Sequence, residues 1–434
     1  MGVSPSGLSQ EFYRRDGTVK ASPLPGGKFM IQQIFLSAFR DFKTSSQLTA
    51  EQLSAAECIM KCKTGELGYN YYQCSECGHI MRVPCSCGNR NCPNCQAVAK
   101  EAWLEERKGE LIDAPYFHIV GTLPHELNPL LAANKKILYE LLHRSMGKSL
   151  VELSNDTQYL GATPGIIQII HTWDQQLNYH VHVHCVISGG GLDEKGKLIV
   201  LKPGTSFFIP VKVIAAMYRG KFMAGLRDLY NAGKLTLPKS LASLAAPDDW
   251  KAYISNLYKI DWNVYIKQTF NGNGNAIEYL ARYANRIAIS NNRIVSVSGD
   301  TVTFSYIDRK DNCRKKEMTV THQEFIRLFL QHVIPKGFQK IRYYGFLSNS
   351  TRKKNLETIF AQQGGRKYEP RFDKSTPLDA IVTSVWGGHV NECPCCGNDT
   401  MEFISSTREI RMMEKASGYK SPPTIKWQPR GQPA

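Results

Sequence analysis

The sequence predicts an α+β fold in which helices pack against a mainly antiparallel sheet. Short segments rich in β-branched and aromatic residues, such as 165–173, alternate with longer segments of helical periodicity. Two strand segments, 292–299 and 301–308, are joined by Gly299-Asp300, a dipeptide typical of tight hairpin turns. Strands joined by hairpins and interrupted by helices favour an antiparallel sheet.

The chain divides into segments of different composition. Residues 1–27 are rich in Ser, Gly and Pro, so we expect a disordered arm there. A helical region follows, and its second helix begins at Thr49, a favourable N-cap residue. The predicted parts are the arm (1–27), a helical and zinc-binding domain (28–105), an α+β domain (106–335) with an insertion (235–260), a basic segment (336–385), a Cys-rich knuckle (386–404) and a polar tail (405–434). Further strands of the α+β domain are expected at 116–124, within 178–192 and at 261–270, and its helices at 129–152, 211–230 and 275–289.

Positive charge dominates the chain and indicates a nucleic-acid partner. The formal net charge is +16 at pH 7, and Lys and Arg release counterions when they neutralise phosphates. Residues 336–371 hold nine Lys or Arg against two Glu, with Tyr and Phe interleaved. Such a composition is typical of strips that follow phosphates and stack on bases. The candidate DNA contacts in this strip are Arg342, Arg352, Lys353 and Lys354.

The apolar segments are too short for a membrane or secreted protein. A membrane helix needs about 18 consecutive apolar residues, and the longest runs here are far shorter. The first residues lack the apolar core of a secretory signal. We therefore expect no membrane partner and a cytoplasmic protein, and the family resemblance given below implies a nucleoid-associated protein of prokaryotic type.

Cysteines are concentrated in two places. Eight of the 13 lie between Cys58 and Cys95, and three more lie within 393–396. Without a secretory signal, metal-bound thiolates are favoured over disulfides.

Two C-x-x-C pairs, separated by fourteen residues, predict one structural zinc site. We assign its ligands as Cys74, Cys77, Cys92 and Cys95. Other nearby thiols either complete a second zinc site, with His79 as a candidate partner, or are plain buried thiols. These are Cys62, Cys85 and Cys87.

Alternate histidines in NYHVHVHCV indicate a metal site on one face of a strand. His180, His182 and His184 would project to the same side, because side chains alternate across a strand. If the preceding strand returns through a turn near 176–177, His171 faces His182. Three converging imidazoles would leave open positions, as a catalytic Mg²⁺ or Mn²⁺ ion requires. His180 is the alternative third ligand, although three ligands spaced along one strand span too far for one ion.

Three glycines follow the histidine segment, at 189–191. Glycine in a strand can let another backbone approach closely. We expect these residues either to admit a DNA backbone or to mark the exit from strand to loop.

Two tyrosines are candidate nucleophiles. Tyr279 and Tyr283 are four residues apart, so they share one face of the predicted helix. Arg282 and Arg286 flank them with groups suited to bind phosphate. A metal-polarised phosphate would allow tyrosine attack, forming a phosphotyrosine and freeing a sugar hydroxyl. The alternative is that both tyrosines are ordinary core residues.

Six segments in the same order carry a family resemblance. They are CGNRNCPNCQ, GTLPHELN, HTWDQQLNYHVHVHCVISGGGL, YRGKFMAGL, YLARYANRIAIS and IRYYGFLSN, within residues 56–400. This set resembles rolling-circle transposases of the two-tyrosine, His-hydrophobic-His (HUH) group, the IS91 family.

The resemblance implies an N-terminal zinc-binding domain and an HUH endonuclease-like catalytic domain. That domain would nick single-stranded DNA at element ends, form a 5′-phosphotyrosine and transfer the strand. Carried onto this chain, the His pair is His182 and His184, and the nucleophiles are Tyr279 and Tyr283. The chain departs from the pattern at Asn91, where relatives commonly carry His, and at Val181, where Pro is common.

Other function classes share some of these features. A replication initiator or relaxase would use the same chemistry, but the chain lacks the Walker motif of a helicase. A metal-dependent nuclease that uses water would not need the tyrosine pair, and a zinc protein that only binds DNA would need neither tyrosines nor histidines. The sequence leaves the oligomeric state and the division of labour between the tyrosines open.

Overall fold

The computed structural model describes most of the helical, zinc-binding and α+β parts of the chain. The described residues are 11–13, 19–20, 30–95, 103–202, 204–205, 207–270, 287–309, 311–368 and 392–408. Four predicted site residues lie outside them: Tyr279, Tyr283, Arg282 and Arg286.

A six-stranded sheet organises the largest core, with strand order β13-β6-β7-β5-β9 and β8 paired to β7. Its strands are β5 (Tyr116–Thr122), β6 (Thr163–Trp173), β7 (Tyr179–Leu192), β8 (Leu198–Val200), β9 (Val264–Phe270) and β13 (Ile341–Gly345). All of these pairings are antiparallel, so the predicted α+β class is confirmed. The edge strand β13 comes from the predicted basic segment, which therefore extends this sheet.

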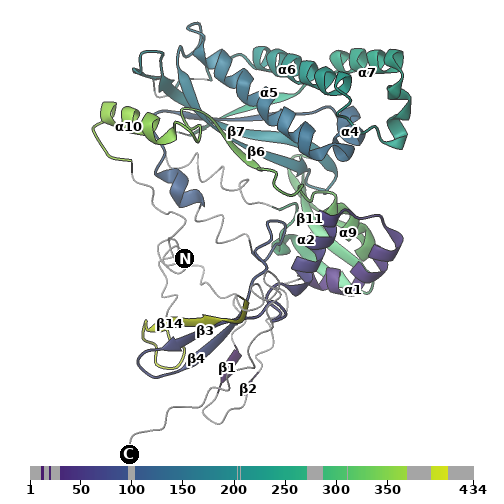
Figure 1. The fold of residues 1–434 in the computed structure, drawn as a ribbon, viewed down its shortest axis with the longest axis vertical. Helices are drawn as coiled ribbons and strands as arrows, with labels where there is room; N and C mark the ends of the chain where they lie inside the picture. The colour runs from purple at the N-terminus through teal and green to yellow at the C-terminus, as the bar shows by residue number, and fades with distance from the viewer. Residues whose placement is uncertain are drawn as a thin grey trace, which may run out of the picture.

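Helices cover one face of the sheet, as Figure 1 shows for α5 and α6. The helical elements here are η1 (His125–Leu127), α4 (Asn128–Ala133), α5 (Lys135–Asn155), α6 (Val211–Asn231), η2 (Lys239–Ala245) and α7 (Pro247–Lys259). Side-chain alternation sends Ile170 and Val183 to this face, where they share a core with Met146 of α5. Trp250, from the predicted insertion 235–260, joins the same core.

The opposite face of the sheet has an apolar half and a histidine half. In the apolar half, Ile167 and Val186 pack against Leu356 of α10 (Arg352–Gln362). Strand pairing places His171 and His184 on the same face, nearer the β6–β7 turn. The histidines therefore lie beside a buried apolar surface rather than over the helical core.

A smaller three-stranded sheet packs with the N-terminal helices. Its strands are β10 (Ile294–Ser298), β11 (Thr301–Asp308) and β12 (Arg314–Thr321), and its helices are α1 (Met30–Ser45), α2 (Ala50–Lys61) and α9 (His322–Leu330). The predicted hairpin is confirmed by the pairing of Ser298 with Thr301. The predicted Thr49 cap is confirmed by a reciprocal pair of hydrogen bonds with Gln52. Trp173, at the end of β6, joins this second core and connects it to the histidine hairpin.

A third sheet, in the lower part of Figure 1, combines strands from the N-terminal and C-terminal parts of the chain. Its order is β14-β3-β4-β1-β2, formed by β1 (Glu11–Tyr13), β2 (Val19–Lys20), β3 (Tyr69–Cys74), β4 (Ile80–Pro84) and β14 (Met401–Ser406). The arm predicted to be disordered thus contributes two short strands, because the edge of β4 offers β1 a hydrogen-bonding partner and β1 in turn pairs with β2. Within the described parts of the chain, no helix has the length and apolar character needed to cross a membrane.

Candidate functional site

The β6–β7 hairpin fixes the positions of the histidines. His171 pairs with His182, and Ile169 pairs with His184, so the predicted register is confirmed. Asp174 closes the turn, since its carboxylate accepts hydrogen bonds from the backbone N–H groups of residues 176 and 178, both at 2.8 Å.

Three imidazoles converge on this face. The candidate ligand nitrogens of His171, His182 and His184 all lie within 4.8 Å of one another. The Nε2 atoms of His182 and His184 are 3.1 Å apart. His180 is not part of this group, although its ring centre lies 5.0 Å from that of His182. The geometry therefore brings together the His171 set rather than the His180 alternative.

Hydrogen bonds orient two of these rings. The Nδ1 atom of His182 is 2.9 Å from the carbonyl oxygen of His180, which can only accept a hydrogen bond. The Nδ1 atom of His184 is 3.0 Å from Nε2 of His118. An imidazole that donates through Nδ1 keeps its Nε2 lone pair for a metal ion. Both contacts thus fit Nε2 ligation.

His118 is a member of the site that sequence reasoning missed. It lies on β5, paired opposite Val186, and its ring is nearly parallel to that of His184, at 11° and 5.2 Å between centres. Its sequence signal was a single histidine in the strand segment 116–124. Only the pairing of β5 with β7 places it behind His184.

Burial favours the neutral form of the His182 and His184 imidazoles. It lowers the pKa of His182 to about 3, and it lowers the pKa of His184 well below the ordinary 6.5. Neutral imidazole is the form that binds metal ions, so these ligands need lose no proton at pH 7.

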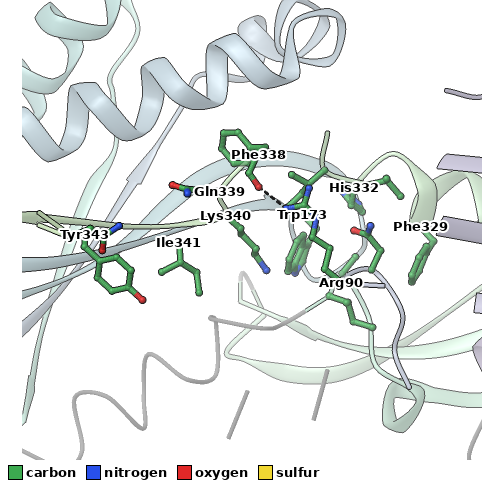
Figure 2. A pocket seen from close by; sticks show the side chains of 15 residues that line it. Arg90, Trp173, Phe329, His332, Phe338, Gln339, Lys340, Ile341 and Tyr343 are labelled. Carbon is green, nitrogen blue, oxygen red and sulfur yellow. Dashed lines mark hydrogen bonds between the residues drawn. The ribbon is translucent and has the colours of Figure 1, made fainter. Parts of the chain in front are cut away.

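A cavity of about 420 Å³ lies beside Trp173, near the end of β6 (Figure 2). Trp173 lines it, and its ring stacks on that of His171 with centres 4.4 Å apart. The Lys340 ammonium group lies 5.1 Å from the centre of the Trp173 ring. Ile287 and Ala288, near the end of the predicted helix 275–289 that carries the two tyrosines, also line the cavity. Aromatic and cationic groups therefore meet beside the histidines.

Two arginines predicted to contact DNA interact with other residues of the fold. Arg342 pairs opposite Gln168, on the helix-covered face of the sheet, and its guanidinium lies 3.8 Å from Glu140 of α5. Arg352 binds the buried Glu110 at 3.2 Å and stacks over the Tyr343 ring. Both arginines thus have partners within the fold.

The neighbouring Lys353 and Lys354 are exposed on α10. The ammonium group of Lys353 lies 3.9 Å from the carboxylate of Glu357, a surface pair that water and salt weaken. These two lysines remain the described candidates for DNA contact in the basic strip.

The glycines at 189–191 serve the packing of the sheet itself. β7 continues through them to Leu192. A Cβ atom on Gly191 would lie 2.2 Å from the carbonyl oxygen of Thr163 in β6. The close backbone is therefore the neighbouring strand, and β7 ends directly after the glycines, at Leu192.

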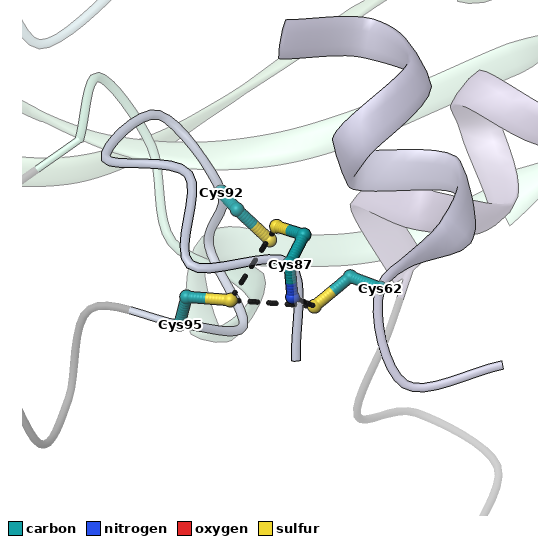
Figure 3. A group of neighbouring side chains, drawn as sticks. All are labelled: Cys62, Cys87, Cys92 and Cys95. Atoms are coloured by element: carbon teal, nitrogen blue, oxygen red, sulfur yellow. Dashed lines mark hydrogen bonds between the residues drawn. The ribbon is translucent and has the colours of Figure 1, made fainter. Parts of the chain in front are cut away.

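The cysteines form two clusters, and the predicted four-cysteine set is divided between them. One cluster contains Cys62, Cys87, Cys92 and Cys95 (Figure 3), and the other contains Cys74, Cys77, Cys393 and Cys396. The prediction failed because Cys92 and Cys95 return to the end of α2, where Cys62 lies, whereas Cys74 ends β3 in the third sheet. Cys85 is in neither cluster, and its Sγ is 3.4 Å from Oδ1 of Asn70. His79 belongs to neither group.

The sulfur separations suit tetrahedral zinc. Cys95 Sγ lies 3.3 Å from Cys62 Sγ and 3.5 Å from Cys87 Sγ. Four thiolates at about 2.3 Å from a zinc ion would be about 3.8 Å apart. Each cluster already offers four sulfur ligands, which is a full set for zinc. Neither cluster therefore needs the histidine that relatives commonly carry at the position of Asn91.

Comparisons with known proteins cover both the histidines and the first cluster. Residues 165–355 match a family model described as "Putative transposase", and residues 34–123 match one described as "Transposase zinc-binding domain". "Putative transposase y4qJ" of Sinorhizobium fredii (strain NBRC 101917 / NGR234) is 36% identical over 379 residues, covering 85% of this chain and 92% of that protein. "Transposase for insertion sequence element IS801" of Pseudomonas savastanoi pv. phaseolicola is 31% identical over 310 residues, covering 70% of this chain and 72% of that protein. No solved structure matches the chain.

Proposed function

Because the chain belongs to the IS91 family of transposases, with an N-terminal zinc-binding domain, we propose that it moves DNA by an HUH-type, rolling-circle mechanism. In this mechanism the protein nicks single-stranded DNA at the element end, holds the strand as a 5′-phosphotyrosine and transfers it. The observation that carries the proposal is the convergence of His171, His182 and His184 on one face of the β6–β7 hairpin.

The three histidines suit a catalytic ion better than a structural one. Three protein ligands leave coordination positions for a phosphate oxygen, whereas a structural zinc site is closed by four. We expect Mg²⁺ or Mn²⁺ to act here. When bound, such an ion neutralises a phosphate oxygen and makes the phosphorus more electrophilic.

Tyr279 and Tyr283 are the proposed nucleophiles. The hydroxyl oxygen of one tyrosine would attack the scissile phosphorus, and the bond from phosphorus to the 3′ oxygen of the neighbouring sugar would break. The phosphotyrosine keeps the energy of the broken bond, so the strand can be rejoined without a nucleotide cofactor. This assignment is supported by Ile287 and Ala288, which line the same cavity as Trp173, since Ile287 lies only four residues after Tyr283 in the sequence.

The DNA strand is proposed to reach the histidines past Trp173 and Lys340. An indole ring can stack on a base, and an ammonium group can bind a phosphate. Stacking suits a single strand, whose bases are not paired. Lys353 and Lys354 are proposed to add sequence-independent attraction, and Arg282 and Arg286 to bind phosphate near the nucleophiles.

Zinc is proposed to have a structural role at the first cluster. Its ligands would be Cys62, Cys87, Cys92 and Cys95, all within the matched zinc-binding range. Arg90, from the same loop, donates a hydrogen bond to the Phe338 carbonyl oxygen at 2.6 Å, which connects the cluster to the cavity.

The histidine site can be tested by nicking of a labelled single-stranded oligonucleotide that spans the end of the element encoding the chain. His182→Ala and His184→Ala should each lower the Mn²⁺-dependent nicking rate by more than about 100-fold, because loss of a ligand costs at least as much as loss of its supporting partner. DNA affinity should change little.

His180→Ala is the matched control, since it is the same residue type on the same strand but lies outside the group. It should keep its activity, and His171→Ala should lose it. Full nicking by His182→Ala would contradict the metal site, and loss at His180 with retention at His171 would give the third position to His180.

A further inference from the structure

The second cysteine cluster joins segments more than 300 residues apart in the sequence. Cys74 Sγ is 3.7 Å from Cys396 Sγ, and Cys77 Sγ is 3.6 Å from Cys393 Sγ. All four sulfurs lie within 4.8 Å of one another. Cys393 and Cys396 fall outside the matched zinc-binding range, which ends at residue 123.

The two halves of this cluster have the same local structure. The sequences are CSECG at 74–78 and CPCCG at 393–397. In each half the glycine N–H donates to the carbonyl of the first cysteine, at 3.0 Å for Gly78 and 2.8 Å for Gly397. Both glycines have a positive φ, at 69° and 74°. The fold therefore presents two equivalent C-x-x-C turns to each other.

Backbone N–H groups also point at the sulfurs. The N–H of Cys77 donates to Cys74 Sγ at 3.4 Å, and the N–H of Cys395 donates to Cys393 Sγ at 3.4 Å. Such bonds favour the thiolate, which is the form that binds metal.

Strand pairing holds the two turns together. In the β14–β3 pair, Met401 lies opposite Cys74, and the N–H of Ser75 donates to the Thr400 carbonyl oxygen at 3.0 Å. The buried core at this place is small and consists of Cys74, Met81, Cys393 and Met401. So small a core gives little stability by hydrophobic burial, and domains of this kind usually depend on a metal or on disulfides.

Disulfides do not fit the sulfur positions. The closest separations across the two turns, 3.6 and 3.7 Å, exceed the S–S bond length of about 2.05 Å. They are close to the distance of about 3.8 Å between thiolates on one zinc ion.

We propose that Cys74, Cys77, Cys393 and Cys396 bind a second structural zinc ion, which clasps the C-terminal knuckle to the N-terminal β3–β4 turn. The zinc-binding module is then completed only by residues that follow the catalytic part of the sequence. The inference is independent of the tyrosine mechanism, because it concerns metal content and assembly alone.

The test is the number of zinc ions per chain, measured by elemental mass spectrometry of protein that has been purified under reducing conditions. The full chain should hold two zinc ions. Cys393→Ser and Cys396→Ser should each leave one, and so should Cys92→Ser through the other cluster. Combining Cys92→Ser with Cys393→Ser should leave none.

Cys395→Ser is the matched control, because Cys395 lies in the same knuckle but is exposed and outside the cluster. It should keep both zinc ions. Two ions retained by Cys393→Ser, or an equal loss in Cys395→Ser, would overturn the proposal.

A second measurement tests the clasp itself and does not depend on the folding of a cysteine variant. A specific protease site is introduced within residues 370–390, and the chain is cut there under reducing conditions. The fragment that carries the knuckle should stay bound to the rest of the protein with zinc present and separate when a chelator removes zinc. Separation with zinc present, or retention after its removal, would overturn the clasp.

Discussion

His118 supports His184 from behind the metal face, through the 3.0 Å contact between its Nε2 and Nδ1 of His184. We expect it to act as a positioning residue. His118→Leu should weaken the apparent affinity for Mn²⁺ by about 10- to 100-fold, as loss of a ligand's supporting partner does elsewhere. The measurement is the nicking rate as a function of Mn²⁺ concentration, and saturating Mn²⁺ should restore most of the rate.

His118→Gln is the conservative control, because its side-chain amide can occupy the place of Nε2. It should retain more Mn²⁺ affinity than His118→Leu. An unchanged Mn²⁺ dependence in the Leu variant would show that His118 is only a core residue.

His143 makes stability depend on pH. It is a buried residue of α5, its Nδ1 lies 3.0 Å from the Gln168 amide in β6, and burial lowers its pKa to about 4. In the unfolded chain its pKa is about 6.5. The neutral ring therefore stabilises the fold fully above pH 6.5, and this contribution is lost as the pH falls towards 4.

Between pH 7 and pH 5 this residue should cost the fold about 2 kcal/mol. Urea unfolding of the wild type and of His143→Gln at both pH values isolates its contribution. The variant should be less stable at pH 7 but should lose less on acidification. Equal losses in the two proteins would contradict the burial argument.

Single residues could be predicted where local spacing decides their position. His171, His182 and His184 follow from strand alternation and one turn. The cysteine sets do not, because a C-x-x-C spacing identifies a pair but leaves open which other pair it meets. Cys393 and Cys396 reach Cys74 only through the pairing of β14 with β3.

At the scale of elements, composition predicted charge but not partners. Composition alone makes the segment 336–371 one basic strip. In the fold, β13 places Arg342 against α5, and Arg352 of α10 binds Glu110. The role of the glycines at 189–191 likewise depends on the strand beside them, β6, which their own sequence does not identify. In both cases the missing information was a contact between distant parts of the sequence.

Helix α10 gives a test of the remaining charges. The double variant Lys353→Gln, Lys354→Gln should bind all DNA sequences more weakly. It should also lower the magnitude of the slope of log affinity against log salt concentration by about 1 to 2 units. Each lost phosphate contact lowers that magnitude by about 0.7 to 0.9 units. The measurement is DNA affinity over a series of salt concentrations.

Arg352→Gln is the contrasting variant. It leaves the buried Glu110 without one of its cationic partners, so it should lower the free energy of unfolding more than it changes the salt slope. An unchanged salt slope in the double lysine variant would show that Lys353 and Lys354 do not contact DNA.

At the scale of the whole molecule, elements from different predicted segments share one core. Helices α1 and α2 share a core with β10–β12, and β1, β2 and β14 lie in one sheet. Hydrophobic periodicity identifies helices and strands, but it does not say which distant elements share a core. The α+β class and the antiparallel sheet could be predicted because they depend on local patterns.

The same arrangement brings several parts of the chain to the proposed site of DNA cleavage. The β6–β7 hairpin holds the histidines, its turn contacts the three-stranded sheet through Leu177, and the loop of the first cysteine cluster reaches the adjoining cavity through Arg90. Three parts of the chain thus meet at the site where DNA is proposed to be cut.

The central claim is that the nicked strand becomes attached to Tyr279 or Tyr283, and the most direct measurement is peptide mapping of the trapped adduct. The protein is incubated with single-stranded DNA and Mn²⁺, denatured and digested, and the DNA-bearing peptide is identified. The mechanism predicts a peptide that contains residues 279–283. It also predicts no adduct in the double variant Tyr279→Phe, Tyr283→Phe, and a normal adduct in Tyr265→Phe, a control at an exposed tyrosine of β9. An adduct on another residue, or full cleavage by the double variant, would contradict the mechanism and favour a nuclease that uses water.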